Sequence, residues 1–184
     1  ILPFLEEGKS LRTVSFNEEE LKLLKGFQLL TIKPVLYVAN VNEDGFESNP
    51  FLNQINDLAN EEGSEVVAIC AELEAEISGL TNDEKIEFLK ELGLEESGLD
   101  RLTRAGYKLL GLQTYFTAGE KEVRAWTINV GDSAPKAAGK IHTDFERGFI
   151  RAETVTFDDY IQNNGEKGSK AVSYTHLRAH ETAR

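Results

Sequence analysis

The sequence lacks the features that define several classes of protein. Its single cysteine, Cys70, excludes a disulfide within the chain, and no Cys/His spacing of a zinc site is present. One unpaired cysteine fits a reducing compartment, so we expect a cytoplasmic protein. The longest apolar runs are about eight residues, far below the roughly 20 that span a bilayer, and we expect no membrane partner. The segment Ile1 to Glu6 has no Met and no basic region, so it is not a signal peptide, and we expect it to continue an earlier segment.

Positive charge is also scarce. The 184 residues carry a formal net charge of −12, with 28% charged and 40% hydrophobic residues. These proportions indicate a globular protein with enough apolar residues for one core or two small ones. The acidic balance argues against broad electrostatic binding to nucleic acid, so we expect no DNA partner. A net acidic charge is still compatible with a local basic patch on the surface.

The last residues differ from the rest of the chain. Residues 172–184 resemble the conceptual translation of a sequencing adapter, and we expect them to be a non-native tail. They contain His176 and His180, whose spacing of four would otherwise suggest a metal site on a helix. With the tail set aside, the sequence offers no metal ligands.

The first 110 residues predict an α/β domain. A capping pattern from Ser15 to Glu20 predicts a helix within residues 1–33. The apolar run from Val35 to Ala39 is typical of a strand buried on both faces of a parallel sheet. Asn49-Pro50 begins a helix that Gly63 ends, and Val66 to Cys70 predicts the next strand. Two strands do not make a stable sheet alone, so we expect further strands from preceding sequence.

After a helical stretch from Ala71 to Leu110, the pattern changes to β. Residues 114–117, 123–128 and 149–155 predict three strands, with a turn at Ala118-Gly119. The predicted fold class is therefore α/β followed by a smaller α+β domain from about Gly111.

A polar loop follows the first predicted strand and contains Asn40, Val41 and Glu43. Open parallel sheets bind ligands at the carboxyl ends of their strands, where P-loop GTPases carry Asn-Lys-x-Asp to read guanine. Adenine presents an acceptor where guanine presents a donor, so the altered motif favours ATP over GTP. The alternative is a polar turn between strand and helix without a ligand.

Two other segments carry candidate chemistry. Cys70 and Ala71 end the second strand where GTPases use backbone N–H groups to hold the base, although a buried structural cysteine is the alternative. His142 with Asp144 suggests an acid/base pair, but residues two apart do not face each other on a helix and no nucleophile accompanies them, so a structural loop or a binding surface is the favoured interpretation. A local basic face for RNA phosphates, or alternatively a solvated rim, is formed by Lys136, Lys140, Arg147 and Arg151.

The acidic residues Glu72, Glu74 and Glu76 predict a solvated helix face.

The order of these segments resembles one family. Lys33 to Gly45, Leu112 to Gly119, Glu122 to Thr127 and Ala137 to Ala152 are similar to corresponding segments of the YchF (Obg-like) P-loop ATPases. The resemblance covers about residues 1 to 171. It implies the C-terminal part of a P-loop nucleotide-binding domain, followed by a β-grasp (TGS) domain truncated at its C-terminus.

The resemblance also implies domain boundaries. Residues 1–33 would be the end of a helical insertion and the return to the nucleotide domain. Residues 34–110 would be the C-terminal part of the ATPase (OBG-type G) domain, and residues 111–171 an incomplete TGS domain before the tail 172–184. Truncation would leave open sheet edges, which predicts instability or aggregation.

The function implied is that of a ribosome-associated protein that binds and hydrolyses ATP with Mg²⁺. Adenine contacts would come from Asn40, Val41 and Glu43, with Cys70 and Ala71 beside them, and contacts to the large ribosomal subunit or RNA from Lys136, Lys140, His142, Arg147 and Arg151. The phosphate loop and the Mg²⁺ ligands would precede this chain, so it holds no catalytic residue and we expect it to be inactive alone. One alternative is a TGS module that acts as a ribosome or RNA adaptor without catalysis. The other is an incomplete product with no function of its own.

Overall fold

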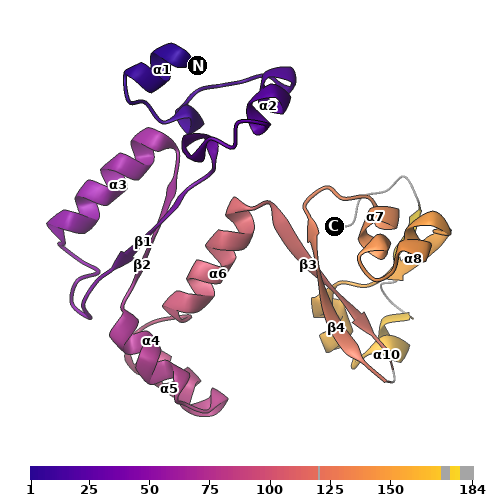
Figure 1. The fold of residues 1–184 in the computed structure, drawn as a ribbon. Coiled ribbons are helices and arrows are strands. Elements are labelled where there is room, and N and C mark those ends of the chain that lie inside the picture. Colours follow the sequence, from indigo (N-terminus) through magenta and orange to yellow (C-terminus); the bar gives the residue numbers. More distant parts are fainter. Residues whose placement is uncertain (120, 171–174, 179–184) are drawn as a thin grey trace. The chain divides into compact units, whose positions relative to one another are not determined.

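The chain folds into two compact units, Ile1–Leu110 and Gly111–Arg184. The structure, a computed structural model, describes residues 1–119, 121–170 and 175–178 (Figure 1). Each unit is taken by itself below.

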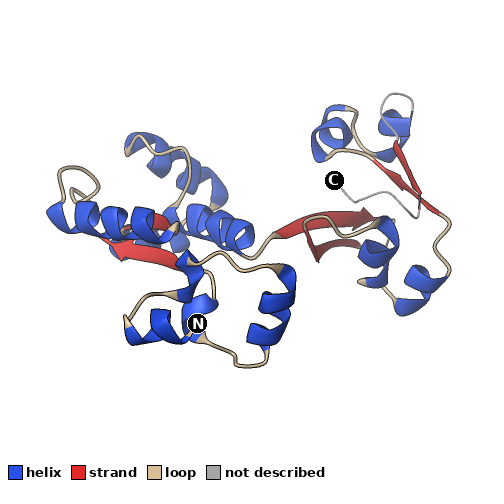
Figure 2. Cartoon of the chain, turned by 90° about the horizontal axis from the view of Figure 1, so that it is seen from above, coloured by secondary structure: helices blue, strands red, loops and turns tan. Residues whose placement is uncertain are grey.

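The first unit is a small parallel sheet among helices, as Figure 2 shows by colour. Its elements are α1 (Leu2–Glu6), η1 (Leu11–Thr13), α2 (Glu18–Lys25), η2 (Leu30–Ile32), β1 (Leu36–Asn40), α3 (Pro50–Glu62), β2 (Glu65–Ile69), α4 (Ala71–Ser78), α5 (Asn82–Glu91) and α6 (Gly98–Leu109). Helix α2 begins after Asn17, whose side chain forms a capping box with Glu20. Both residues lie within the predicted capping pattern from Ser15 to Glu20, and Asn17 Oδ1 accepts from the third helical N–H, that of Glu20.

Strands β1 and β2 pair in parallel, with Leu36 opposite Glu65 and Asn40 opposite Ile69. Helix α3 connects them and begins at the predicted Asn49-Pro50, where Asn49 Oδ1 accepts hydrogen bonds from the N–H groups of Phe51 and Leu52. It ends at Gly63, which adopts φ 67° in the left-handed region. Both α3 and α6 pack on the strands, and Figure 1 shows them on either side of the sheet.

Strand β1 is less buried than its apolar sequence predicts. None of its five residues is fully buried, and Val38 is 44% exposed. The expectation of a strand buried on both faces is wrong for this chain. In the part of the chain that the structure describes, the sheet has two strands. The helices that pack on these strands leave part of the β1 surface uncovered.

Helix α6 begins in a tight environment that joins it to α4. The Glu74 carboxylate accepts hydrogen bonds from the N–H groups of Gly98 (2.6 Å) and Leu99 (3.2 Å). A Cβ on Gly98 would lie 2.8 Å from Glu74 Oε1 and 2.9 Å from Ile69 Cγ2, so a larger residue there would force these two side chains to move. The sequence pattern predicted that Glu74 lies on a solvated helix face, and this prediction is wrong for Glu74. Instead it caps a helix 24 residues away.

The second unit is α+β. It comprises β3 (Leu112–Ala118), β4 (Val123–Asn129), α7 (Ala134–Gly139), α8 (Thr143–Arg147), β5 (Arg151–Thr154), α9 (Phe157–Gln162), α10 (Glu166–Lys170) and β6 (Thr175–Arg178). Strands β3 and β4 form an antiparallel hairpin, and Ile128 is 1% exposed in its core. The Tyr115 hydroxyl donates to the Ala137 carbonyl (3.0 Å), which ties the hairpin to α7. Trp126 is half-buried, and its Nε1 donates to Thr117 Oγ1 (2.9 Å).

Strand β6 lies in the segment that we expected to be foreign to the fold. Its residues pair antiparallel with β5, with Arg151 opposite Arg178 and Thr154 opposite Thr175. Strand pairing uses backbone groups, so an open edge such as that of β5 accepts many sequences. Of the two tail histidines, His176 lies in β6 and His180 lies outside the described residues.

Candidate functional site

The loop after β1 contacts the residue that follows β2. Asn40 is the last residue of β1, and its Oδ1 accepts a hydrogen bond from the backbone N–H of Ala71 (3.0 Å). Ala71 is the first residue of α4, and Cys70 alone lies between it and the end of β2. Two segments 31 residues apart in sequence, both singled out from their patterns, therefore meet at the carboxyl edge of the sheet.

The backbone of this loop is held in place. Val41 is 8% exposed, and its N–H donates to the Ile69 carbonyl (2.8 Å). The Gly45 N–H donates to the Asn42 carbonyl (2.9 Å), and Asn49 Nδ2 donates to the Gly45 carbonyl (3.0 Å). A Cβ on Gly45 would lie 3.1 Å from Asn42 backbone atoms and from Val41 Cβ. The turn thus leads directly from the strand end into the cap of α3.

The other predicted site residues at this edge differ in exposure. Asn40, Glu43 and Ala71 are exposed, whereas Cys70 is 3% exposed. A buried thiol cannot touch a ligand, so the Cys70 side chain packs in the core. The exposed groups are an amide with two N–H donors, a carboxylate and the backbone of the loop. Such groups can bind a planar heterocycle by its edge.

The five predicted RNA-contacting residues lie in the second unit, but ion pairs involve three of them. Lys136 Nζ lies 2.6 Å from Asp132 Oδ1, and Arg151 Nη2 lies 3.9 Å from Glu153 Oε1. The hydrogen bond from Lys136, followed by that from the Asn129 backbone, lowers the pKa of Asp132 to about 2. Lys140 and Arg147 are exposed and make no ion pair within the described residues. Of the predicted basic face, Lys140 and Arg147 are therefore the two side chains without an ion pair among the described residues.

His142 has a local structural contact. Its Nδ1 accepts a hydrogen bond from the Asp144 backbone N–H (3.2 Å), so His142 is the N-cap of α8, and its Nδ1 lies 3.5 Å from Asp144 Oδ2. Both side chains are exposed. Helix capping explains this pair without general acid/base chemistry.

Charge is divided unequally between the units. Residues 1–110 hold 22 Asp and Glu against 10 Lys and Arg, and residues 111–184 hold 10 against 10, which together make the 32 and 20 of the chain. The acidic excess thus belongs to the first unit. A polyanionic partner would meet less repulsion at the second unit.

A polar cluster around Glu62 was not predicted from the sequence. Its carboxylate accepts hydrogen bonds from Ser10 Oγ (2.9 Å), Arg12 Nη1 (3.0 Å) and the Tyr37 hydroxyl (2.7 Å). Arg12 Nε also donates to the Lys33 carbonyl (3.1 Å). The hydrogen bond from Tyr37, and then that from Ser10, lowers the pKa of Glu62, and the bond to Glu62 raises the pKa of Tyr37. This cluster fastens residues 10–12 to the end of α3 and to β1.

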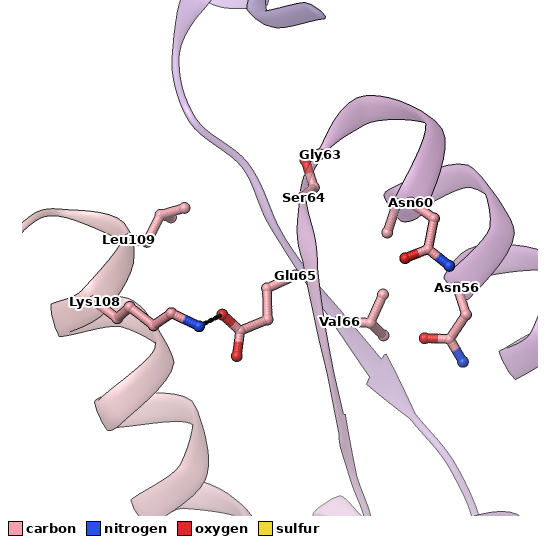
Figure 3. Close-up of a pocket in the computed structure, with 9 residues that line it drawn as sticks. Asn56, Asn60, Gly63, Ser64, Glu65, Val66, Lys108 and Leu109 are labelled. Atoms are coloured by element: carbon pink, nitrogen blue, oxygen red, sulfur yellow. Dashed lines mark hydrogen bonds and ion pairs between the residues drawn. The ribbon is translucent and has the colours of Figure 1, made fainter.

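A cavity of about 530 Å³ lies at the other end of the strands from the Asn40 loop. Figure 3 shows Asn56 and Asn60 of α3 on one side of β2 and Lys108 of α6 on the other, with Lys108 paired to Glu65 (2.9 Å). The residues that line this cavity do not include Asn40, Val41, Glu43 or Ala71. Within the described residues, no group of three His, Cys, Asp or Glu side chains could hold a metal ion. No helix among them is long and apolar enough to cross a membrane.

The first unit belongs to a recognisable class of protein. A parallel βαβ arrangement with polar groups at the carboxyl ends of both strands defines an open α/β domain, and such domains bind ligands at that edge. The chain belongs to the YchF family of that class, as the following matches show.

Matches to known proteins extend over nearly the whole chain. Residues 112–182 match the family model YchF-GTPase_C, described as a protein of unknown function (DUF933). The "Ribosome-binding ATPase YchF" of Pasteurella multocida is 59% identical over 170 residues, which are 92% of this chain and 47% of that protein. That of Bacillus subtilis is 51% identical over 179 residues, or 96% of this chain and 49% of that protein.

The fold agrees with these sequence matches. The structure of the Schizosaccharomyces pombe YchF GTPase superposes with a TM-score of 0.82 at 33% identity, covering 97% of this chain and 48% of that one. The mixed α/β architecture is therefore that of a YchF protein. The chain spans about half the length of the curated relatives it matches.

Proposed function

We propose that this chain is the base-recognising and TGS-containing part of a cytoplasmic, ribosome-associated YchF-type ATPase. The names of the relatives support the family's link to ATP and the ribosome. The observation that carries the proposal is the hydrogen bond from the Ala71 N–H to Asn40 Oδ1, which joins the two strand-end segments at one edge. In this proposal residues 34–110 complete the ATPase domain, residues 111–171 form the TGS domain and residues 172–184 are a non-native tail.

Adenine fits this edge better than guanine on hydrogen-bonding grounds. With Oδ1 of Asn40 engaged by Ala71, the side-chain NH₂ group is the donor that can meet purine N7. The loop backbone at Val41 can meet the exocyclic amine. A carboxylate set against the adenine N1 lone pair would be repulsive, so in this proposal Glu43, whose side chain is one methylene longer than the aspartate of the guanine motif, directs its carboxylate away from N1.

Adenosine should perturb this loop in the chain as it stands. We expect millimolar adenosine to shift the backbone amide resonances of Val41 and Ala71 in a two-dimensional NMR spectrum, because the loop is already formed. Guanosine at the same concentration is the control and should shift them much less. Equal shifts with both nucleosides, or shifts confined to other residues, would contradict base recognition here.

Hydrolysis requires groups that this chain does not hold. Phosphoryl transfer depends on a phosphate-binding loop and on Mg²⁺ held beside it, and the sequence contains no Gly-x-x-x-x-Gly-Lys-Ser/Thr motif. We therefore expect no phosphate release from ATP and Mg²⁺ by the purified chain. Turnover that co-purifies with the chain through two orthogonal columns would show this part of the proposal to be wrong.

Ribosome contact is assigned to Lys140 and Arg147 of the second unit. Both are exposed and unpaired within the described residues, and the unit carries no excess of acid. Lys136, His142 and Arg151 would support them from α7, α8 and β5. The partner would be the large subunit, through its RNA phosphates.

Charge reversal tests this contact. The double substitution K140E/R147E should weaken co-sedimentation with large subunits about tenfold or more, since two attractive contacts become repulsive. The matched control K121E/K167E makes the same charge change at exposed positions of the same unit. Equal loss in both variants would indicate a net-charge effect, and no loss in either would remove the assignment.

A further inference from the structure

The outer edge of β2 carries backbone groups that the sheet does not use. In a parallel ladder, alternate residues direct both their N–H and C=O groups to the same neighbouring strand. The Ile69 carbonyl faces β1, where it accepts from Val41 N. Val67 shares that direction, so Val66 and Ala68 face away from β1. The sheet has no strand beyond β2 in the described part of the chain.

A groove runs along this edge. The cavity of about 530 Å³ continues into one of about 330 Å³, and both are lined by Glu65, Val66 and Lys108. On the α3 side the first cavity offers the amide side chains of Asn56 and Asn60, which Figure 3 shows beside Val66. Side-chain amides pair readily with peptide groups. The groove is therefore suited to a polypeptide backbone.

The α6 wall of the groove is basic, within a unit where acids outnumber bases by more than two to one. Arg101, Arg104 and Lys108 follow one another at spacings of three and four, so they share one face of the helix. Arg104 pairs with Glu96 and Lys108 with Glu65, both at the rim. The Arg104 and Lys108 side chains are 71% and 75% exposed, so other carboxylates can reach them.

Arg101 lies at the strand edge itself. Its Nη2 donates to the Ala68 carbonyl (3.0 Å), whereas its Nε is buried without a hydrogen-bond partner among the described residues. Its guanidinium also lies over the Phe46 ring, 5.9 Å from the ring centroid. Arg101 is therefore part of the inner wall of the groove, and the cations that an incoming acidic group can reach are the exposed Arg104 and Lys108.

We propose that the outer edge of β2 binds an extended acidic peptide segment of a partner protein as an added strand. The N–H and C=O groups of Val66 and the N–H of Ala68 pair with the peptide backbone, and Arg104 and Lys108 receive its carboxylates in place of Glu96 and Glu65. The β2 edge supplies affinity through the main chain, and the basic wall selects for acidic side chains. The residues that form this surface differ from those proposed to contact adenine.

The test uses a fluorescein-labelled heptapeptide of alternating Glu and Val and the full 184-residue chain, with binding followed by fluorescence anisotropy. We expect saturable binding in the micromolar range. A peptide with Lys in place of Glu should not bind. A Glu/Val peptide that is N-methylated at alternate residues should bind at least about tenfold more weakly, because it has lost strand-pairing donors. Equal affinity of the methylated peptide, or no binding of the parent peptide at millimolar chain, would overturn the proposal.

Variants locate the site. R104E/K108E should weaken peptide binding about tenfold, while the matched control K22E/K25E, with the same charge change at exposed positions of α2, should bind nearly as the parent chain does. Both pairs lie on helix surfaces, and circular dichroism checks that each variant folds. Equal weakening by both pairs would reduce the effect to net charge and contradict the groove. Binding of an eight-nucleotide single-stranded RNA that R104E/K108E abolishes, without peptide binding, would make the groove a phosphate site instead.

Discussion

The substitutions V41K and E43D together are expected to reverse the base preference of the Asn40 loop from adenosine to guanosine. They recreate the Asn-Lys-x-Asp pattern, in which a shorter carboxylate accepts two N–H groups of guanine. Hydrogen bonds to a charged group contribute about 1.5–3 kcal/mol, so guanosine should gain roughly ten- to hundredfold in affinity. Titration of both nucleosides, followed by NMR shifts at Ala71, measures the change.

Two single variants serve as controls for this reversal. E43D alone tests whether the carboxylate position is sufficient, and V41K alone tests whether a longer side chain at a position only 8% exposed disturbs the loop. The amide resonance of Gly45, whose N–H donates to Asn42, reports an intact turn. A double variant that keeps the Gly45 shift and still prefers adenosine would refute the assigned roles of Val41 and Glu43.

The substitution E62A is expected to destabilise the first unit by about 2–4 kcal/mol, because it removes the acceptor of Ser10, Arg12 and Tyr37 and leaves the Arg12 charge unpaired. The Arg12 and Glu62 side chains are only 16% and 15% exposed, so water replaces the lost bonds poorly. Urea unfolding followed by helix ellipticity measures the loss. The neighbouring E61A, at an exposed position of the same helix, should change stability by about 0.5 kcal/mol or less.

The same carboxylate should give the chain an acid-sensitive component of stability. The pKa of Glu62 is lower in the folded state than its ordinary value, so its contribution is fully present above the unfolded pKa, about 4.3. It is lost as pH falls through the lower folded pKa. The stability difference between the parent chain and E62A should therefore shrink below about pH 4. A difference that stays constant down to pH 2 would assign the effect to packing and not to charge.

Local signals were sufficient for the elements whose ends are set by neighbouring residues. Asn49-Pro50 and Gly63 fixed helix α3 because a cap, a favoured first-turn proline and a left-handed glycine act within a few residues. The predicted strand ends Asn40 and Ala71 were brought together because parallel strands place their carboxyl ends at one edge. Periodicity and turn chemistry were therefore enough to predict the bounds of α3 and the edge at which the two strand ends meet.

Contacts between distant segments could not be predicted from these signals. Glu62 and Glu74 look like ordinary acidic residues on helix surfaces, yet their partners lie up to 52 and 25 residues away. The apolar run of β1 indicated a buried strand, but burial depends on how many elements cover it. Hydrogen bonding within the Lys136 to Arg151 segment similarly depends on acids, such as Asp132, whose side-chain directions a sequence does not state.

The unequal division of charge has a consequence for how the chain would approach a large polyanion. Residues 1–110 carry the whole net charge of −12, and residues 111–184 carry none, so the charge of the molecule is distributed asymmetrically. The negative field of a polyanion repels the first unit, which favours approach through the uncharged second unit before any contact forms. Added salt would remove that orientation together with the repulsion. Encounter rates would then respond to ionic strength less steeply than those of a uniformly basic binder, whose attraction salt only weakens.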